Sequence, residues 1–383
     1  MVLEEGFIIK RWVSFLLGLA LMAVVIMNSA PVSVALPDIS AACACVVERR
    51  SGCLIAGVNE HQRASMASTT KIMTALILCE SVDLDSTVVI SKEMTQVEGS
   101  SMGLLPGDTV HYRDLLYGMM LASGNDAATA TAILLAGSVP AFAKRMNARA
   151  AEIGMNDTNF VTPSGLDDDE HYSTAYDMAL LAVEALKNPE FAKAVSSKTA
   201  TLEYGNPPYR RTLSNHNRLL SLCSICDGVK TGFTKKSGRC LVSSAWENDA
   251  GVVVVTLRDP NDWDDHQKLI EYGLSQLETR ILSQPALPDV QILGGCGDLS
   301  LSSEPVTVSL PTDKFVNITA EIELGKTVFA PVEPGESVGR ILYRLDGKVI
   351  AESAIVAVSL VDSDRSVTKA RYRDWIRVLI GSK

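Results

Sequence analysis

The chain has 383 residues, 47% of them hydrophobic, and a formal net charge of −10 at pH 7. A chain of this length and composition fills a substantial core, which excludes a disordered protein and favours more than one domain. Its acidic balance argues against a nucleic-acid partner, because phosphate backbones are bound by basic surfaces.

Residues 1–35 are predicted to be a secretory signal peptide. Lys10 and Arg11 precede an apolar run over residues 12–26, and small residues end the segment at Ala35. This order is typical of export signals. An uncleaved anchor helix is the alternative, although the run is shorter than the roughly 20 residues of a normal span. Both interpretations place the body of the protein outside the cytoplasm, at the membrane face or in the cell wall.

Eight cysteines would lie where disulfides persist if the protein is exported. They stand at positions 43, 45, 53, 79, 223, 226, 240 and 296. Cys223-x-x-Cys226 has the spacing of a redox or zinc motif, but the chain has no second such pair. Buried thiols are the interpretation that we favour over disulfides.

Residues 36–283 are predicted to form one domain in which a helical insert separates two strand regions. Breaks in the helical pattern at Ser-Gly-Asn, Gly137 and Pro-Ser-Gly delimit the helices. The expected strands are Cys43 to Glu48, Cys53 to Val58, Gly228 to Lys230, Arg239 to Ala245 and Gly251 to Leu257. The expected helices are Ser68 to Glu80, Asp114 to Leu121, Asp126 to Leu135, Val139 to Ile153, Thr174 to Leu186 and Asp264 to Leu277.

A second domain, all β, is predicted over residues 286–362. The pattern there alternates without helical periodicity, as at Val306 to Val308 and Ile318 to Ile322, and Asp346-Gly347 marks a hairpin turn. A tail follows over residues 365–383, with six basic side chains against one aspartate. As a helix, the tail places apolar residues on one face, so we predict that it associates with an anionic membrane surface. A helix that packs back on the second domain is the alternative.

Ser68 and Lys71 lie one helical turn apart at the start of an apolar helix. A buried ammonium there is costly unless the lysine takes the proton of the serine hydroxyl. The alternative is a Lys71 that extends to water. Ser366-Val-Thr-Lys369 has the same spacing, so the spacing alone is weak evidence. Ser68 differs because a helix N-terminus stabilises a developing anion.

Two further motifs support a catalytic role for Ser68. Ser123-Gly-Asn125 interrupts the helical region, and Lys230-Thr231-Gly232 ends a predicted strand; each motif occurs once in the chain. Each is commonplace by itself. Their order, and their placement on a helix start, an inter-helix loop and a strand, is typical of penicillin-binding proteins and class A β-lactamases.

The chain resembles the D-alanyl-D-alanine carboxypeptidases of the low-molecular-mass penicillin-binding type, in particular the sporulation and vegetative enzymes of Gram-positive bacteria. The resemblance covers about residues 36–280 most closely. Its sequence blocks are Ala67-Ser-Thr-Thr-Lys-Ile-Met-Thr-Ala, Gly99-Ser-Ser-Met-Gly-Leu, Asp114-Leu-Leu-Tyr-Gly, Ala122-Ser-Gly-Asn-Asp-Ala-Ala, Gly165-Leu-Asp-Asp, His171-Tyr-Ser-Thr-Ala-Tyr-Asp and Gly228-Val-Lys-Thr-Gly-Phe-Thr. It implies an α+β fold of the β-lactamase/transpeptidase-like kind, an antiparallel sheet flanked by helices plus a helical insert, followed by a small β-sandwich domain.

The resemblance also implies the catalytic residues. Ser68 would be the acylated nucleophile, with Lys71 as its base. Ser123 would relay a proton to the leaving D-alanine amine, and Asn125 would hold Lys71 and the substrate amide. Burial and the like charge of Lys230 would lower the pKa of Lys71 enough for it to act as a base.

The remaining site residues would bind substrate. Lys230 and Thr231 would bind the terminal carboxylate, and Gly232 would let the substrate lie along the strand edge. By the same resemblance, the backbone N–H groups of Ser68 and Phe233 would form the oxyanion hole. The expected substrate is a peptidoglycan stem pentapeptide ending in D-Ala-D-Ala, and β-lactam antibiotics would acylate the same serine.

Other functions and site types are less well supported by the sequence. A class A β-lactamase adds a Glu-x-x-Leu-Asn loop, which the chain lacks, and a penicillin-binding sensor needs a transmembrane transducer. No histidine is needed once a lysine serves as base, so we interpret all five as structural. The acidic run over residues 167–170 lacks the Gly and Glu positions of a calcium loop. We therefore expect neither a metal nor a cofactor.

Overall fold

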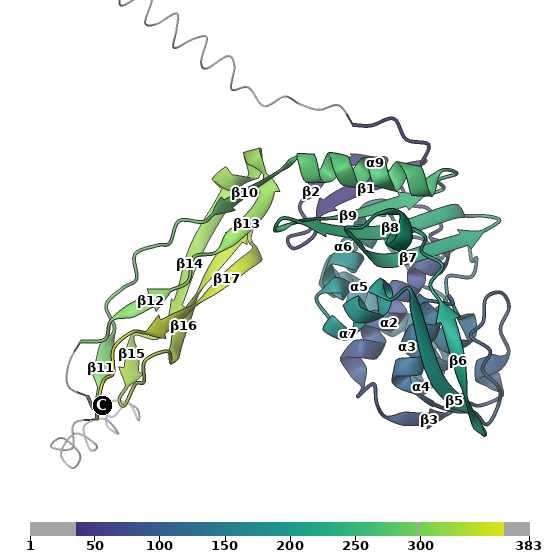
Figure 1. Cartoon of the computed structure of the whole chain (residues 1–383), viewed down its shortest axis with the longest axis horizontal. Helices are drawn as coiled ribbons and strands as arrows, with labels where there is room; N and C mark the ends of the chain where they lie inside the picture. The colour runs from purple at the N-terminus through teal and green to yellow at the C-terminus, as the bar shows by residue number, and fades with distance from the viewer. Residues whose placement is uncertain (1–35, 296–297, 364–383) are drawn as a thin grey trace, which may run out of the picture. The chain divides into compact units, whose positions relative to one another are not determined.

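The computed structural model describes residues 36–295 and 298–363 (Figure 1). The predicted signal peptide, residues 1–35, and the predicted tail, residues 365–383, lie outside the described residues, as does Cys296. Among the described helices, none by itself is both long and apolar enough to cross a membrane. Helices α4 (Asn125–Ala136) and α5 (Val139–Ile153) reach that length and apolarity only together, as a pair bent by 86°.

A five-stranded antiparallel sheet forms the centre of the first domain, in the order β2-β1-β9-β8-β7. The N-terminal hairpin joins strands from the other end of the domain, since Cys43 of β1 pairs with Leu257 of β9. Central strand β9 is a nearly continuous run of buried apolar residues, as expected of a strand covered on both faces. The strands are β1 (Cys43–Glu48), β2 (Leu54–Val58), β7 (Cys226–Thr234), β8 (Gly238–Glu247) and β9 (Ala250–Leu257).

Helices cover both faces of this sheet. Helix α9 packs on one face, and α6 packs on the other, between the sheet and most of the helical insert (Figure 1). Local sequence sets the helix ends: Thr174 caps α6 by accepting from Asp177 N, and Gly154 ends α5 with a left-handed φ of 91°. The helices are α2 (Lys71–Ser81), α3 (Tyr112–Met120), α4 (Asn125–Ala136), α5 (Val139–Ile153), α6 (Ala175–Leu186), α7 (Pro189–Ser196), α8 (Leu219–Leu222) and α9 (Asp262–Ser275).

A second, four-stranded sheet in the first domain was not predicted from the sequence. Its order is β3-β4-β5-β6, with β3 (Thr87–Val89), β4 (Thr109–His111), β5 (Thr199–Gly205) and β6 (Pro208–Ser214). Strand β5 does alternate, with Ala200, Leu202 and Tyr204 toward the core between exposed residues, so this signal was available in the sequence and was missed. Strands β3 and β4 have only three residues each, which is too short for a recognisable pattern. The β5–β6 hairpin contacts the loop that contains Met102 and Gly103.

The second domain is all β, as predicted. Its main sheet has the order β12-β17-β16-β14, and β16 and β17 meet at the predicted turn, with Leu345 paired to Lys348. Strand β10, which directly follows α9, pairs with β13, although the sequence pattern assigned its first residue, Leu277, to the preceding helix. The strands are β10 (Leu277–Ile281), β11 (Gln291–Leu293), β12 (Leu301–Ser303), β13 (Thr307–Pro311), β14 (Ile318–Leu324), β15 (Thr327–Phe329), β16 (Ser337–Leu345) and β17 (Lys348–Ala357). The α+β fold class with a C-terminal β domain is therefore confirmed.

Two local expectations at the motifs were wrong. Strand β7 does not end at Lys230 but continues to Thr234, because its pairing with β8 runs through Gly232 to the β-turn. Ser68 does not begin an α-helix: it lies in η1, the 3₁₀ turn Ala67–Thr70, and α2 starts only at Lys71. The tighter 3₁₀ turn still places the two side chains on one face.

Candidate active site

Ser68 lies on a tight turn between a strained residue and a buried helix. Ala67, directly before it, has a left-handed φ of 48°, which is costly for a residue with a Cβ. The turn is held by the Thr70 hydroxyl, which donates to Ala67 O at 2.8 Å. Ser68 itself remains partly exposed, whereas Thr69, Thr70 and Lys71 are fully buried. The turn therefore presents one hydroxyl to the surface of an otherwise buried segment.

Lys71 is fully buried and uses all three of its hydrogen-bonding directions. Its Nζ lies 2.7 Å from Asn125 Oδ1, 2.7 Å from the carbonyl oxygen of Ser164 and 2.9 Å from Ser68 Oγ. The first two partners can only accept, so they take N–H groups. The third direction faces the serine hydroxyl. In a neutral Lys71 this direction holds the lone pair, and the Ser68 O–H donates to it.

The surroundings of Lys71 favour its neutral form. Burial lowers the pKa of Lys71 well below its usual value, the nearby charge of Lys230 lowers it further, and Asp126 partly opposes both. Burial also lowers the pKa of Lys230, to about 7. The predicted influence of Lys230 on Lys71 is thus present, with desolvation as the larger cause. A lysine in this state can accept the proton of Ser68 near neutral pH.

Asn125 is the first residue of α4 and is held on both sides. Its backbone N–H donates to Ser100 O at 2.7 Å, and its Nδ2 donates to Glu98 O at 2.6 Å, which leaves Oδ1 to accept from Lys71. Ser123, two residues earlier, is 6% exposed and has a left-handed φ of 56°. Its hydroxyl makes no hydrogen bond to another described residue, so its predicted proton-relay role stays a prediction.

Strand β7 places the Lys230-Thr231-Gly232 motif against the turn Ala67–Thr70 that carries Ser68, here called the nucleophile turn. A Cβ built on Gly232 would lie 3.1 Å from Ser68 N and 3.0 Å from Met66 O, so glycine keeps the space over the Ser68 N–H open. That space is where an oxyanion hole requires room. Lys230 is buried and donates to Thr231 O at 2.9 Å, and Phe233 is 66% exposed at the edge of the site.

Ser164 and Gly165 are functional residues that sequence reasoning missed. The sequence marked Pro-Ser-Gly only as a helix break, yet Ser164 O is one of the three partners of Lys71. A Cβ on Gly165, whose φ is +83°, would lie 1.9 Å from Ala67 O. Glycine is therefore required for this loop to approach the nucleophile turn. A glycine in one of the blocks that resemble the family was the available signal.

His171 supports the turn from behind. Its Nδ1 accepts from Val161 N at 2.9 Å, so the proton is on Nε2, which donates to Thr70 Oγ1 at 2.8 Å. Burial lowers the pKa of His171 to about 4. A histidine that stays neutral and hydrogen-bonded on both nitrogens fits the predicted structural role. His266 lies in a similar environment on α9, with its pKa lowered by burial to about 3.

Among the described residues, neither a cluster of metal-ligating side chains nor a pair of bonded cysteines forms a second site. No group of three or more His, Cys, Asp or Glu side chains in residues 36–295 and 298–363 is arranged to hold a metal ion. The acidic run instead bonds to the end of β7, where Thr234 donates to Asp167 Oδ1 at 2.9 Å and Lys236 pairs with Asp169 at 2.6 Å. The seven described cysteines carry free thiols, four of them buried.

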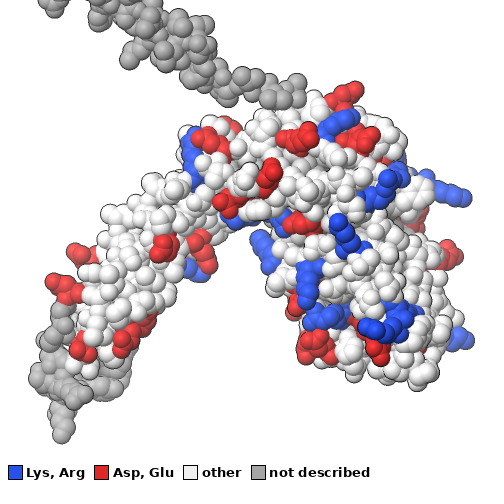
Figure 2. Space-filling model, in the orientation of Figure 1, with Lys and Arg blue, Asp and Glu red and all other residues white. Residues whose placement is uncertain are grey.

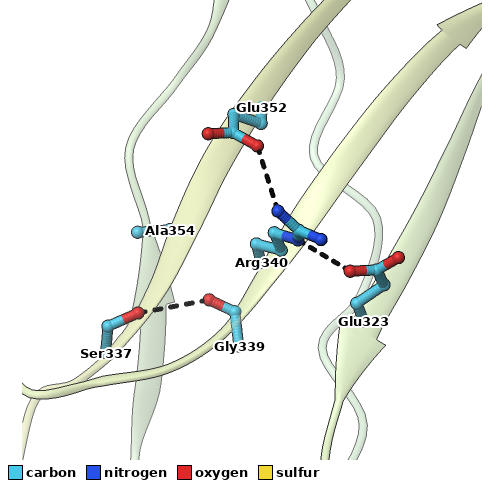
Figure 3. Close-up of a pocket in the computed structure, with 6 residues that line it drawn as sticks. All are labelled: Glu323, Ser337, Gly339, Arg340, Glu352 and Ala354. Carbon is cyan, nitrogen blue, oxygen red and sulfur yellow. Dashed lines mark hydrogen bonds and ion pairs between the residues drawn. The ribbon is translucent and has the colours of Figure 1, made fainter. Parts of the chain in front are cut away.

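A hollow of ≈ 390 Å³ on the second domain is distinct from this site (Figure 3). Arg340 of β16 lies between Glu323 and Glu352 on the neighbouring strands, at 2.7 Å and 3.6 Å. These exposed cross-strand ion pairs stabilise a sheet by a few tenths of a kcal/mol each. The Ser337 hydroxyl in the hollow donates to Gly339 O at 3.4 Å and has no base beside it, and the charged side chains there are exposed, so the hollow shows no catalytic arrangement.

The fold and the serine–lysine arrangement define a serine acyl hydrolase of the penicillin-binding class. Residues 30–261 match the D-alanyl-D-alanine carboxypeptidase family, and residues 298–363 match the C-terminal domain of penicillin-binding protein 5. The chain therefore belongs to the D-alanyl-D-alanine carboxypeptidase family, whose members are serine hydrolases.

Individual relatives agree with this assignment along most of the chain. D-alanyl-D-alanine carboxypeptidase DacF from Bacillus subtilis is 31% identical over 349 residues, which cover 87% of this chain and 90% of that protein. Penicillin-binding protein 5 from Haemophilus influenzae superposes with a TM-score of 0.63 at 29% identity, over 86% of this chain and 100% of that structure. D-alanyl-D-alanine carboxypeptidase DacD from Francisella tularensis superposes with a TM-score of 0.61 at 28% identity, over 86% and 95% of the two chains.

Proposed function

We propose that the protein removes the terminal D-alanine from peptidoglycan stem pentapeptides ending in D-Ala-D-Ala, through an acyl-enzyme on Ser68. The observation that carries the residue assignment is the contact of a fully buried Lys71 with Ser68 Oγ, while two carbonyl oxygens occupy its other N–H groups. Family membership supports the reaction, since the relatives above are named for it.

Acylation begins with proton transfer from Ser68 to Lys71. The Oγ–carbon bond forms at the carbonyl between the two D-alanines, and the developing oxyanion lies at the N–H groups of Ser68 and Phe233. The carbon–nitrogen bond then breaks, and the leaving D-alanine amine receives the proton held by Lys71, with Ser123 as the relay. Water next attacks the ester carbonyl, the Oγ–carbon bond breaks, and Ser68 regains its proton.

Lys230 and Thr231 bind the carboxylate of the terminal D-alanine in this proposal. Lys230 has two N–H groups beyond the one that it donates to Thr231 O, and a bound carboxylate favours its charged form. The substrate backbone runs beside β7, where Gly232 leaves room against the nucleophile turn. β-Lactam antibiotics present a carboxylate and a reactive amide to the same groups and acylate Ser68.

We further propose that the protein is exported and works at the outer face of the cytoplasmic membrane. The support is the basic, apolar and small-residue order of residues 1–35, and the amphipathic, basic pattern of residues 365–383. On the face drawn in Figure 2, acidic and basic side chains are interspersed over the described surface. Residues 365–383 carry six basic side chains against one aspartate, a charge that an anionic lipid surface would attract.

Two measurements on the purified protein test the catalytic proposal. One follows D-alanine release from a pentapeptide ending in D-Ala-D-Ala, and the other follows labelling by a fluorescent penicillin. Ser68→Ala should abolish both while the fold is retained, and Ser366→Ala, at the matching motif in the tail, should change neither. Label that maps to Ser366 would contradict the assignment. Rapid loss of label without peptide cleavage would indicate a β-lactamase, and stable label without cleavage would indicate a sensor.

A further inference from the structure

Asp126, the residue after Asn125, is a buried carboxylate for which the proposed mechanism has no use. It is 1% exposed, and its carboxylate has no lysine or arginine partner among the described residues. A buried charge without a counter-ion is costly unless hydrogen bonds replace its hydration. Five such bonds are present, and four of them come from one segment of the chain.

These four bonds hold residues 98–104, here called the rim segment. Asp126 Oδ1 accepts from Met102 N at 3.0 Å, and Oδ2 accepts from Gly103 N and Leu104 N at 3.0 Å each and from the Ser101 hydroxyl at 2.6 Å. The fifth bond comes from Ala127 N at 2.9 Å. The rim segment has no regular secondary structure, so the N–H groups of Met102 and Leu104 depend on this carboxylate, while that of Gly103 also donates to Ser101 Oγ at 2.8 Å.

The carbonyl groups of the rim segment are held from the opposite side. The Tyr204 hydroxyl donates to Met102 O at 2.8 Å, and Arg211 Nη1 donates to Gly103 O at 2.6 Å. Both side chains come from the β5–β6 hairpin. The rim segment is thus fixed between α4 and this hairpin through its own backbone.

The rim segment in turn holds the amide that contacts the catalytic lysine. Glu98 O accepts from Asn125 Nδ2 and Ser100 O accepts from Asn125 N, at 2.6 Å and 2.7 Å. With Nδ2 committed to Glu98, only Oδ1 can face Lys71, where it accepts at 2.7 Å. Gly99 keeps this contact close, since a Cβ there would lie 2.9 Å from Asn125 Nδ2.

We propose that Asp126 is a positioning residue for acylation: its carboxylate fixes the rim segment, and the rim segment fixes Asn125 on Lys71. The proposal rests on the proposed function and adds a residue to it. Asp126 also supplies the one negative charge that acts on Lys71. Among the described residues, the charged groups that influence the pKa of Lys71 are Lys230 from β7, which lowers it, and Asp126 from α4, which raises it.

Asp126→Asn keeps the shape of the side chain but places an amide NH₂ against the N–H groups of Gly103 and Leu104. The rim segment must then move, and displacement of Asn125 should lower the acylation rate by about 10²-fold. Removal of the negative charge lowers the pKa of Lys71 further, so the rising limb of the pH–rate profile should move to lower pH. A purely structural role would leave that limb in place.

Two variants complete the test. Ser101→Ala removes one donor to Asp126 and keeps the charge, so acylation should slow by roughly tenfold or less with no movement of the limb. Glu48→Gln is the matched control, because Glu48, at the end of β1, is also buried and accepts from Arg50 N, Ser51 N and the Ser51 hydroxyl at 2.6–3.0 Å, in a turn that does not contact the rim segment. It should leave both the rate and the limb unchanged.

The measurements are fluorescent-penicillin acylation rates of the full chain against pH, with thermal unfolding as the check of folding. Wild-type protein that is not acylated would refute the proposed function, not this inference. A limb that stays at its wild-type position in Asp126→Asn, or an equal loss of rate in Glu48→Gln, would overturn the inference. If Asp126→Asn does not fold, Ser101→Ala decides: slower acylation than in Glu48→Gln supports the positioning role, and equal rates overturn it.

Discussion

Gly165→Ala should damage the site through the loop that brings Ser164 O to Lys71. The added Cβ would lie 1.9 Å from Ala67 O, and Cβ contacts below 3.0 Å are essentially never observed, so the loop must retreat by about 1.1 Å. Ser164 O moves with it, and its 2.7 Å hydrogen bond to Lys71 is lost.

The size of the effect follows from these terms. A left-handed backbone costs alanine about 1–2 kcal/mol, and leaving a buried N–H of Lys71 without a partner costs about 1–3 kcal/mol. Gly165→Ala should therefore lower the free energy of unfolding by roughly 2–5 kcal/mol. Misplacement of Lys71 by a fraction of its hydrogen-bond length should slow acylation by about 10²-fold.

Urea unfolding and the acylation rate with a fluorescent penicillin measure the two effects. Gly154→Ala is the control, since Gly154 has a φ of +91° and no atom within 4 Å of a built Cβ. That variant should show only the backbone cost, about 1–2 kcal/mol, and a wild-type acylation rate. If Gly165→Ala is acylated as fast as Gly154→Ala, the contact between Ser164 and Lys71 does not position the base.

Three further predictions concern charge, pH and the tail. Lys230→Ala should move the rising limb of the pH–rate profile to higher pH, because Lys71 loses a like-charged neighbour and keeps its proton to higher pH. A rising limb that does not move would exclude Lys230 as an influence on the pKa of Lys71. The free energy of unfolding should fall as the pH drops from about 6.5 toward 4, because His171 becomes protonated in the unfolded chain but has a pKa of about 4 in the folded protein. Urea titrations at several pH values should show a shallower fall in His171→Gln than in the wild type, and equal falls in the two proteins would count against this linkage. A protein that ends at Val361 should still release D-alanine from small peptides but should no longer sediment with anionic vesicles, whereas the full chain should sediment with them in a salt-sensitive way. Equal sedimentation of the two proteins would refute membrane anchoring by residues 365–383, and loss of folding on truncation would favour a tail helix packed on the second domain.

Local patterns in the sequence were sufficient for the chemistry and for the longer elements. The apolar run after Lys71 predicted a buried helix, the alternation in the last third predicted an all-β domain, and the order of three short motifs predicted a serine–lysine site. These features depend on residues close together in the chain. Periodicity and residue type therefore carry the information without reference to the rest of the fold.

The tertiary structure alone decided which distant groups meet. Ser164 is 93 residues from Lys71, and its contribution is a backbone carbonyl, which every residue has, so no residue type could signal it. The four hydrogen bonds that Asp126 accepts from the rim segment come from residues 22 to 25 positions away in the chain. Such contacts depend on how the sheet and the helical insert pack together. For this protein, the sequence determined which groups perform the chemistry, and the packing of the whole domain determined how they are held, because a hydrogen bond requires a precision that only the assembled core provides.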